Sequence, residues 1–181
     1  MENGTSAEVV SFWRTAGADR WFEVDGDFDL TIRSRFLGVH EAAARGDLAA
    51  LEERAEGALA LVILLDQFPR NMFRGSARAF ATDALARAVA NRALARGFDQ
   101  QTDTTMRPFF YLPFMHSELL ADQDRCVELH EAFGDPERSR YAAIHRDIIL
   151  KFRRFPHRNR ILGRETTQAE QEFLDGGGFA G

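Results

Sequence analysis

The stretch "EGALALVILLDQFPRN", residues 56–71, predicts an apolar helix followed by a proline. A helix is expected over about residues 56–67, and it is more apolar than the other helical segments. Its longest uninterrupted apolar run, at 58–65, has eight residues, whereas a membrane-spanning helix needs about 20. Pro69 is expected to end this helix, because a proline ring clashes with the preceding turn and biases the residue before it away from helical angles.

Helix signals also dominate on both sides of this stretch. Thr5 and Glu8 have the spacing of a capping box, and so do Thr167 and Glu170. We expect further helices at 29–46, 47–54, 76–96, 117–133, 137–154 and 167–174, with a broken short helix within 108–115. Asp47 and Ser76 are expected to begin two of them, while Tyr141, Ile144, Ile148 and Phe152 are expected to form the inner face of the helix at 137–154.

Sustained alternation of apolar and polar residues, the mark of a half-buried strand, occurs nowhere in the chain. The sequence therefore predicts an all-α fold of about seven to eight helices. Short links between them favour antiparallel neighbours. We expect one domain over residues 1–175 and a Gly-rich tail over 176–181.

Charge and composition narrow the possible partners. The 181 residues carry a net charge of −5, which argues against a nucleic-acid or anionic-membrane binder, because both need a broad basic surface. A single cysteine fits a reducing compartment, and the first residues lack the basic start and apolar core of a secretion signal. We expect a cytoplasmic protein with no nucleic-acid partner, no membrane association and no cofactor.

A second basic motif resembles the segment around Pro69. "KFRRFPHRNRILGR", residues 151–164, contains six basic residues and no acid. Like the segment around Pro69, it runs from apolar residues into Phe-Pro, a basic residue and an Asn. Phe68-Pro69 and Phe155-Pro156 are 87 residues apart (155 − 68). We expect these two turns to lie near each other and to form the walls of one polar site.

Three long motifs resemble a bacterial family, domain of unknown function 924. They are "LALVILLDQFPRNMFRGSARAFATD", "LPFMHSELLADQ" and "RFPHRNRILGRETTQAEQEFL", and the resemblance extends in order over nearly the whole chain. It implies an all-helical fold of the tetratricopeptide-repeat-like kind and no established activity. At Arg153 the chain departs from the family, which tends to have Gly there.

The candidate site residues come from the two Phe-Pro turns. The two turns carry five arginines, whose guanidinium groups are permanently charged. Asp66 and Asp83 are the two acids expected near them, which leaves an excess of three positive charges (5 − 2). A phosphate or carboxylate ligand would relieve that excess, and Glu118 and Glu165 could do so internally. The candidate ligand-binding residues are Asp66, Arg70, Asn71, Arg74, Asp83, Arg154, Arg158, Asn159 and Arg164. The alternative is structural: the same Arg and Asn side chains tie down helix ends.

Histidines are the candidate proton-transfer groups, since their ordinary pKa lies near neutral pH. His116 and His157 are the candidate catalytic residues, and His116 is also compatible with a structural role at a helix corner. His145 borders an apolar face and is expected to be semi-buried. Cys126 and His130 share a helix face at four-residue spacing, but two ligands do not make a zinc site, so no metal site is expected.

Two functions from different classes remain open. The first is binding of a small anionic ligand in an arginine-lined cleft, with hydrolase or transferase chemistry. The second is a helical scaffold that binds a protein or peptide. Solvent-open arginines lining a pocket favour the first. An exposed apolar groove, with the arginines bonded to acids or to the backbone, favours the second.

Overall fold

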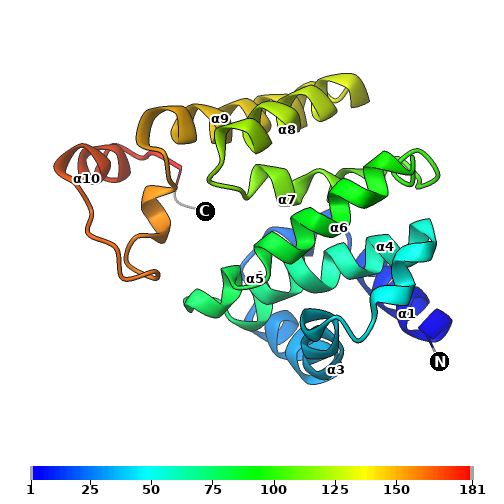
Figure 1. Cartoon of the computed structure of the whole chain (residues 1–181). Helices are drawn as coiled ribbons and strands as arrows, with labels where there is room; N and C mark the ends of the chain where they lie inside the picture. The colour runs from blue at the N-terminus through cyan, green and yellow to red at the C-terminus, as the bar shows by residue number, and fades with distance from the viewer. Residues whose placement is uncertain (1, 180–181) are drawn as a thin grey trace. The chain divides into compact units, whose positions relative to one another are not determined.

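The computed structural model describes residues 2–179, and this part of the chain is all-helical, with no strand. The all-α prediction is therefore confirmed. Within these residues seven α-helices have eight residues or more, in agreement with the expected seven to eight (Figure 1). They are α1 (Glu2–Ala16), α3 (Gly26–Arg45), α4 (Ala55–Val62), α6 (Asp83–Ala95), α8 (Leu120–Phe133), α9 (Pro136–Phe152) and α10 (Gln168–Asp175).

Shorter segments complete the described helices. Three α-helical turns are α2 (Ala18–Trp21), α5 (Phe68–Met72) and α7 (Leu112–Met115). The 3₁₀ turns are η1 (Ala49–Glu53), η3 (Ala77–Phe80), η4 (Arg107–Phe110) and η5 (Pro156–Arg158), and η2 (Ile63–Gln67) is a π-helical turn. No helix within residues 2–179 has both the length and the apolar character that crossing a membrane requires.

The chain forms two compact units. Unit 1 comprises residues 1–74 and 78–113, and unit 2 comprises 75–77 and 114–181. A single domain over 1–175 stays a prediction. The expected tail at 176–181 lies in part outside the described residues, as does Met1 of the N-terminal segment.

The core of unit 1 is built around α4. Every residue from Gly57 to Pro69 is buried, and α1 and α6 pack against α4. A helix that is apolar on all sides needs neighbours all round, and the run at 58–65 supplies such a helix. Gly57 is required here, because a Cβ at this position would overlap the carbonyl of Leu51 in η1.

Pro69 does not end the central helix, and that prediction is wrong. The chain continues from α4 through η2 into α5, where Pro69 lies in the first turn. The backbone N–H of Phe68 donates to the carbonyl of Ile63, five residues back, which is the π-helical pattern. This wide turn places Pro69 at the start of a new α-helical turn, where a missing N–H costs little.

Three expected helix starts also differ from the structure. Thr5 lies inside α1 instead of capping it, and Leu48, not Asp47, precedes η1. Ser76 precedes only the 3₁₀ turn η3, and the long helix α6 begins at Asp83. The first two differences amount to one helical turn or less, where helix boundaries are least certain, whereas α6 begins seven residues after Ser76 (83 − 76).

Unit 2 contains a hairpin of α8 and α9, which lie side by side (Figure 1). Gly134 ends α8 in the left-handed conformation, and the carboxylate of Asp135 caps α9 by accepting from the N–H groups of Glu137 and Arg138. The predicted capping box of α10 is confirmed, since Thr167 and Glu170 bond each other's backbone N–H groups.

The buried face of α9 differs in part from the expected one. Ile148 is buried as predicted, but Tyr141 and Ile144 are exposed. The other buried positions are Ala142, His145 and Ile149. The buried face of α9 is therefore shifted by about one residue from the expected one, because His145 is buried in place of Ile144.

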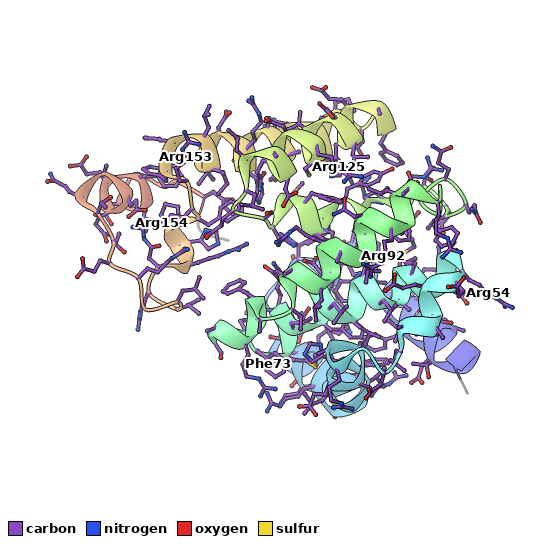
Figure 2. All side chains as sticks on the ribbon, viewed as in Figure 1. Arg54, Phe73, Arg92, Arg125, Arg153 and Arg154 are labelled. Atoms are coloured by element: carbon purple, nitrogen blue, oxygen red, sulfur yellow. The ribbon has the colours of Figure 1, made fainter. Side chains whose placement is uncertain are left out.

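Arg153 ends α9 in a conformation that suits glycine. Its φ is 61°, and it is the one non-glycine residue with positive φ within residues 2–179. This is the position where the resembling family tends to have Gly. Arg153 and Arg154 lie together at the end of α9 (Figure 2). A left-handed conformation costs an L-residue about 1–2 kcal/mol, so this helix end carries local strain.

Replacing Arg153 by Gly is expected to stabilise the protein. Relief of the left-handed strain outweighs the extra freedom that Gly gains on unfolding, for a net rise of about 0.5–1 kcal/mol in unfolding free energy. Urea denaturation followed by circular dichroism measures this. Gly134→Arg, at the matching position of α8, should lower stability. An Arg153→Gly variant no more stable than wild type would contradict the strain.

Candidate functional site

The arginine turn of unit 1 is a closed network. Both terminal nitrogens of Arg70 donate to the carboxylate of Asp83, at 2.9 and 3.0 Å. Arg70 also donates to the backbone carbonyl of Asp66 and lies 3.3 Å from its carboxylate, which is fully buried. Although burial lowers the pKa of Arg70, the two carboxylates outweigh it and raise that pKa. The predicted trio Asp66, Arg70 and Asp83 is thus brought together.

The other two residues of this turn share an acid that the sequence reasoning missed. Asp29 in α3 accepts a hydrogen bond from Asn71 at 2.8 Å and two from Arg74, at 2.7 and 3.0 Å. The separations along the chain are 42 and 45 residues, so no local spacing could have indicated this pairing.

In unit 2, Glu170 has the same organising role. Arg154 donates to both of its carboxylate oxygens and to the backbone carbonyl of Glu165. Asn159 donates to Glu170 at 3.3 Å. Hydrogen bonding from Arg154 is the main reason that the pKa of Glu170 is lowered to about 2. The same carboxylate caps α10, so the basic motif is tied directly to that helix.

Arg164 pairs with Glu118, one of the two acids expected to balance the charge. Two hydrogen bonds, at 2.7 and 3.0 Å, join their side chains. Glu118 also accepts from the N–H of Phe155, while Arg164 donates to the Phe155 carbonyl and to Asn159. Although burial raises the pKa of Glu118, these hydrogen bonds lower it overall.

Arg158 is nearly buried and bonds the backbone. One of its terminal nitrogens donates to the carbonyl of His116 at 3.0 Å, and its guanidinium lies over the ring of Phe155, 4.5 Å from the centroid. This corner brings His116 and Arg158 together through a main-chain oxygen.

These contacts change the charge count. Five carboxylates pair with four of the arginines, Arg70, Arg74, Arg154 and Arg164: the two expected acids plus Asp29, Glu118 and Glu170. The excess of three falls to zero (5 − 5) within the described contacts. Glu165 contributes its backbone carbonyl instead of a carboxylate. The two turns belong to different units, and their proximity stays a prediction.

The histidines of unit 2 gather around aromatic rings. His145 lies 4.4 Å from the Phe179 ring centroid, and His157 lies 5.4 Å from it. Both also contact Phe155. Desolvation by burial is the main cause that lowers the pKa of each to about 4, and Arg158 adds to the effect. His157, a candidate catalytic residue, is therefore neutral at pH 7 and a weak base.

A groove in unit 1 is the other candidate site. It encloses about 450 Å³ and is lined by residues of α1, α2, α3 and the link between α2 and α3. Phe12 and Phe28 form its floor, with rings stacked at 5.7 Å between centroids. The remaining lining residues are Thr15, Ala16, Arg20, Asp25, Asp27, Thr31 and Arg35.

The walls of this groove are held in place by buried contacts. The indole N–H of Trp21 donates to the carbonyl of Trp13 at 2.6 Å, and its ring packs against Phe109. Asp25 caps α3 by accepting from the N–H groups of Asp27 and Phe28. The link at 22–25 is therefore fixed at both ends. Sequence reasoning identified it only as a turn-rich connection.

Exposed apolar side chains occur on the same segment of the chain as several lining residues of the groove. Phe22, Val24 and Leu30 are 69, 79 and 65% exposed. They follow one another within nine residues on the segment that also supplies Asp25 and Phe28. Three large exposed apolar groups within nine residues are unusual for a free surface, since exposed apolar groups favour contact with another molecule.

Residues 4–179 contain no group of three or more His, Cys, Asp or Glu side chains placed to hold a metal ion. Cys126 is buried, which raises the pKa of its thiol to about 12. His130 is also buried, and its pKa is lowered to about 4, mainly by desolvation. A reactive thiolate at neutral pH is thereby excluded for Cys126.

Comparison with known proteins identifies the family. Residues 9–178 match the family described as "Bacterial protein of unknown function (DUF924)". The chain belongs to this family. A solved structure of a protein of unknown function, ATU0120 from Agrobacterium tumefaciens, is similar to this DUF924 chain, with 48% identity and a TM-score of 0.94. The similarity covers 97% of this chain and 99% of that one. No curated protein matches the chain.

The stability of this DUF924 protein is expected to fall in mild acid. His145 and His157 have folded-state pKa values of about 4, below the unfolded value of about 6.5. Between these values the unfolded chain binds more protons, so unfolding free energy decreases as pH falls from about 6.5 towards 4. Thermal melts across this range should show a smaller pH slope for a His145→Gln, His157→Gln variant. An unchanged slope would contradict the assignment.

Proposed function

We propose that this DUF924 protein is a non-enzymatic binding scaffold, whose groove between α1 and α3 holds a segment of a partner protein. The observation that carries the proposal is the groove of about 450 Å³ lined by Phe12 and Phe28, on a segment of the chain that also carries the exposed Phe22, Val24 and Leu30. Ligand pockets in proteins have volumes of about 300–1,000 Å³. Contiguous exposed apolar groups mark interaction surfaces in soluble proteins.

The arginine contacts support this function over anion chemistry. Four of the five arginines in the two turns pair with a carboxylate of their own unit, and Arg158 bonds a backbone carbonyl. The groove lining contains no His or Cys that could act as base or nucleophile. A fixed aromatic floor suits an apolar anchor residue, because large buried side chains supply most of the binding energy at interfaces.

A display selection of random peptides on the purified full chain tests the proposal. Peptides should be recovered whose affinity falls about tenfold or more in a Phe22→Ser, Leu30→Ser variant. Both side chains are exposed, so the variant should keep its melting temperature. Fluorescence anisotropy of labelled peptides measures the affinities.

The matched control is a Leu85→Ser, Leu150→Ser variant. It also removes two exposed large apolar groups, 44 and 49% exposed, outside the groove, and it should bind the selected peptides like wild type. A selection that yields no peptide dependent on Phe22 and Leu30 would refute the scaffold function.

Anion binding near η5 is a second candidate, supported by the remaining charge of residues 151–164. Two of their six basic side chains pair with Glu118 and Glu170. Among the described contacts, Lys151, Arg153 and Arg160 have no carboxylate partner. In this candidate Arg158 would hold a phosphate or carboxylate group, because its planar fork bonds such groups bidentately. His116 or His157 would transfer the proton in any hydrolase or transferase reaction.

An Arg158→Lys variant separates the two candidates. If Arg158 holds an anion, phosphate or a small carboxylate should raise the melting temperature of wild type but not of the variant. Lys cannot form the two parallel hydrogen bonds that a guanidinium group makes to such an anion. If its role is structural, the variant melts earlier and no anion shifts wild type, because a badly paired buried group costs about 1–3 kcal/mol. Arg160→Lys, at a nearby exposed position, is the control for a general charge effect.

A further inference from the structure

We infer that residues 176–179 form a strap that lies closed over His145 and His157 at neutral pH and opens when these histidines take up protons. The inference concerns regulation within unit 2, and it is independent of the groove in unit 1. It comes from the turn that directs the strap, from the side chains beneath it and from the charges around them.

The strap begins with a tight turn at the end of α10. The backbone N–H of Gly177 donates to the carbonyl of Leu174 at 3.2 Å. The next N–H, that of Gly178, donates to the carbonyl of Phe173 at 2.9 Å. These two bonds, with the positive φ of 77° at Gly177, make a Schellman motif, which ends a helix and turns the chain. The glycine-rich segment is therefore an ordered turn that directs Phe179.

Gly178 is required for this turn. A Cβ at this position would lie 2.5 Å from the carbonyl oxygen of Phe173 and 2.6 Å from atoms of its ring. Only glycine permits so close an approach to backbone. A Gly178→Ala substitution should therefore displace the strap without changing any side chain beneath it.

Phe179 covers the two histidines. Its ring centroid lies 4.4 Å from that of His145 in α9 and 5.4 Å from that of His157 in η5. The same ring packs against the buried apolar cluster of unit 2, formed by Ile148, Ile149 and Phe155. One side chain of the strap thus shields an imidazole from each of two elements.

Protonation conflicts with the closed arrangement. Nδ1 of His145 donates to the carbonyl of Tyr141 at 2.7 Å, because a carbonyl only accepts, so a further proton goes to Nε2. Nδ1 of His157 is buried and has no hydrogen-bond partner among the described residues. A charged imidazole carries a hydrogen on both ring nitrogens. A charged His157 would therefore bury an N–H without an acceptor, which is costly.

The surrounding charges act in the same direction. Burial is the main cause that lowers the pKa of both histidines to about 4, and each adds to a cluster of mostly basic groups. The other titratable groups that act on the pair are His116, Glu118, Arg158 and Arg164. Of these, Glu118 alone favours a positive charge, and it already accepts two hydrogen bonds from Arg164.

Acid therefore favours the open strap. In the closed state both pKa values are about 4, whereas a histidine in water has a pKa of about 6.5. Between these values the open state binds more protons, so opening becomes more favourable as pH falls. From pH 7 to pH 5 the opening equilibrium should rise by up to about 20-fold for each histidine.

An NMR pH titration of the full chain tests the inference. At pH 7.5 the rings of Phe179 and His145 should show a nuclear Overhauser contact, which should be lost near pH 5 as the amide signals of Gly177 and Gly178 shift. The amide of Glu170, in the capping box of α10, should keep its folded position, which separates opening from unfolding. A strap that stays closed until the Glu170 signal is lost would overturn the inference.

Variants separate the histidines from the turn. In a His145→Gln, His157→Gln variant the glycine amides should keep their closed positions at pH 5. Gly178→Ala should be open at pH 7.5, and the pKa of both histidines should rise by about one unit or more. Gly38→Ala, in α3, is the control, because a Cβ there meets open space, and it should titrate like wild type. Opening of the glutamine variant at pH 5, or unchanged histidine pKa values in Gly178→Ala, would contradict the histidine-controlled strap.

Discussion

The buried carboxylate of Asp66 is the constraint on which unit 1 depends. It is fully buried within the most apolar segment of the chain, and an uncompensated charge in such a place costs several kcal/mol. Gln67 and Arg70 supply its partners, and Arg70 in turn pairs bidentately with Asp83 at the start of α6. The central helix and α6 are thus joined by a network as well as by apolar packing.

This constraint explains why the arginine motif of unit 1 is so conspicuous in the sequence. Asp66 needs a permanently charged partner, and the guanidinium plane of Arg70 bonds Asp83 at the same time as it approaches Asp66. In unit 2, Glu118 and Glu170 occupy the corresponding roles for Arg164 and Arg154. Arg70, Arg74, Arg154 and Arg164 are therefore each balanced by a carboxylate of their own unit.

The sequence determined those parts of the fold that depend on neighbouring residues. The all-helical class, the glycine stop at Gly134 and the capping box of Thr167 and Glu170 all follow from local spacing, and the structure contains them. The sequence could not predict that the helix continues past Pro69. This continuation depends on a π-helical turn, and such a turn has no characteristic residue composition.

The candidate site shows the same division. Asp66, Arg70 and Asp83 were correctly grouped from motifs, but Asp29 and Glu170 were missed as their partners, since pairing over long sequence distances comes from tertiary packing. The groove was missed for a different reason: Phe22 and Val24 look like ordinary core residues, and only their exposure makes them informative. The available signal was five acids among residues 17–30, in a link otherwise rich in aromatic residues.

The π-helical turn also sets how the central helix can tolerate changes in length. An α-helix advances about 100° per residue, and η2 accommodates one residue more than an α-helical turn would hold. Deleting a single residue within 63–67 would restore a regular ladder and leave Arg70 and Asn71 close to their present directions, because the π-helical turn is what absorbs the extra residue. Residues 63–67 are therefore the part of the central helix where the loss of one residue changes side-chain direction least, whereas a further insertion there would rotate Arg70 and Asn71 by about 100°.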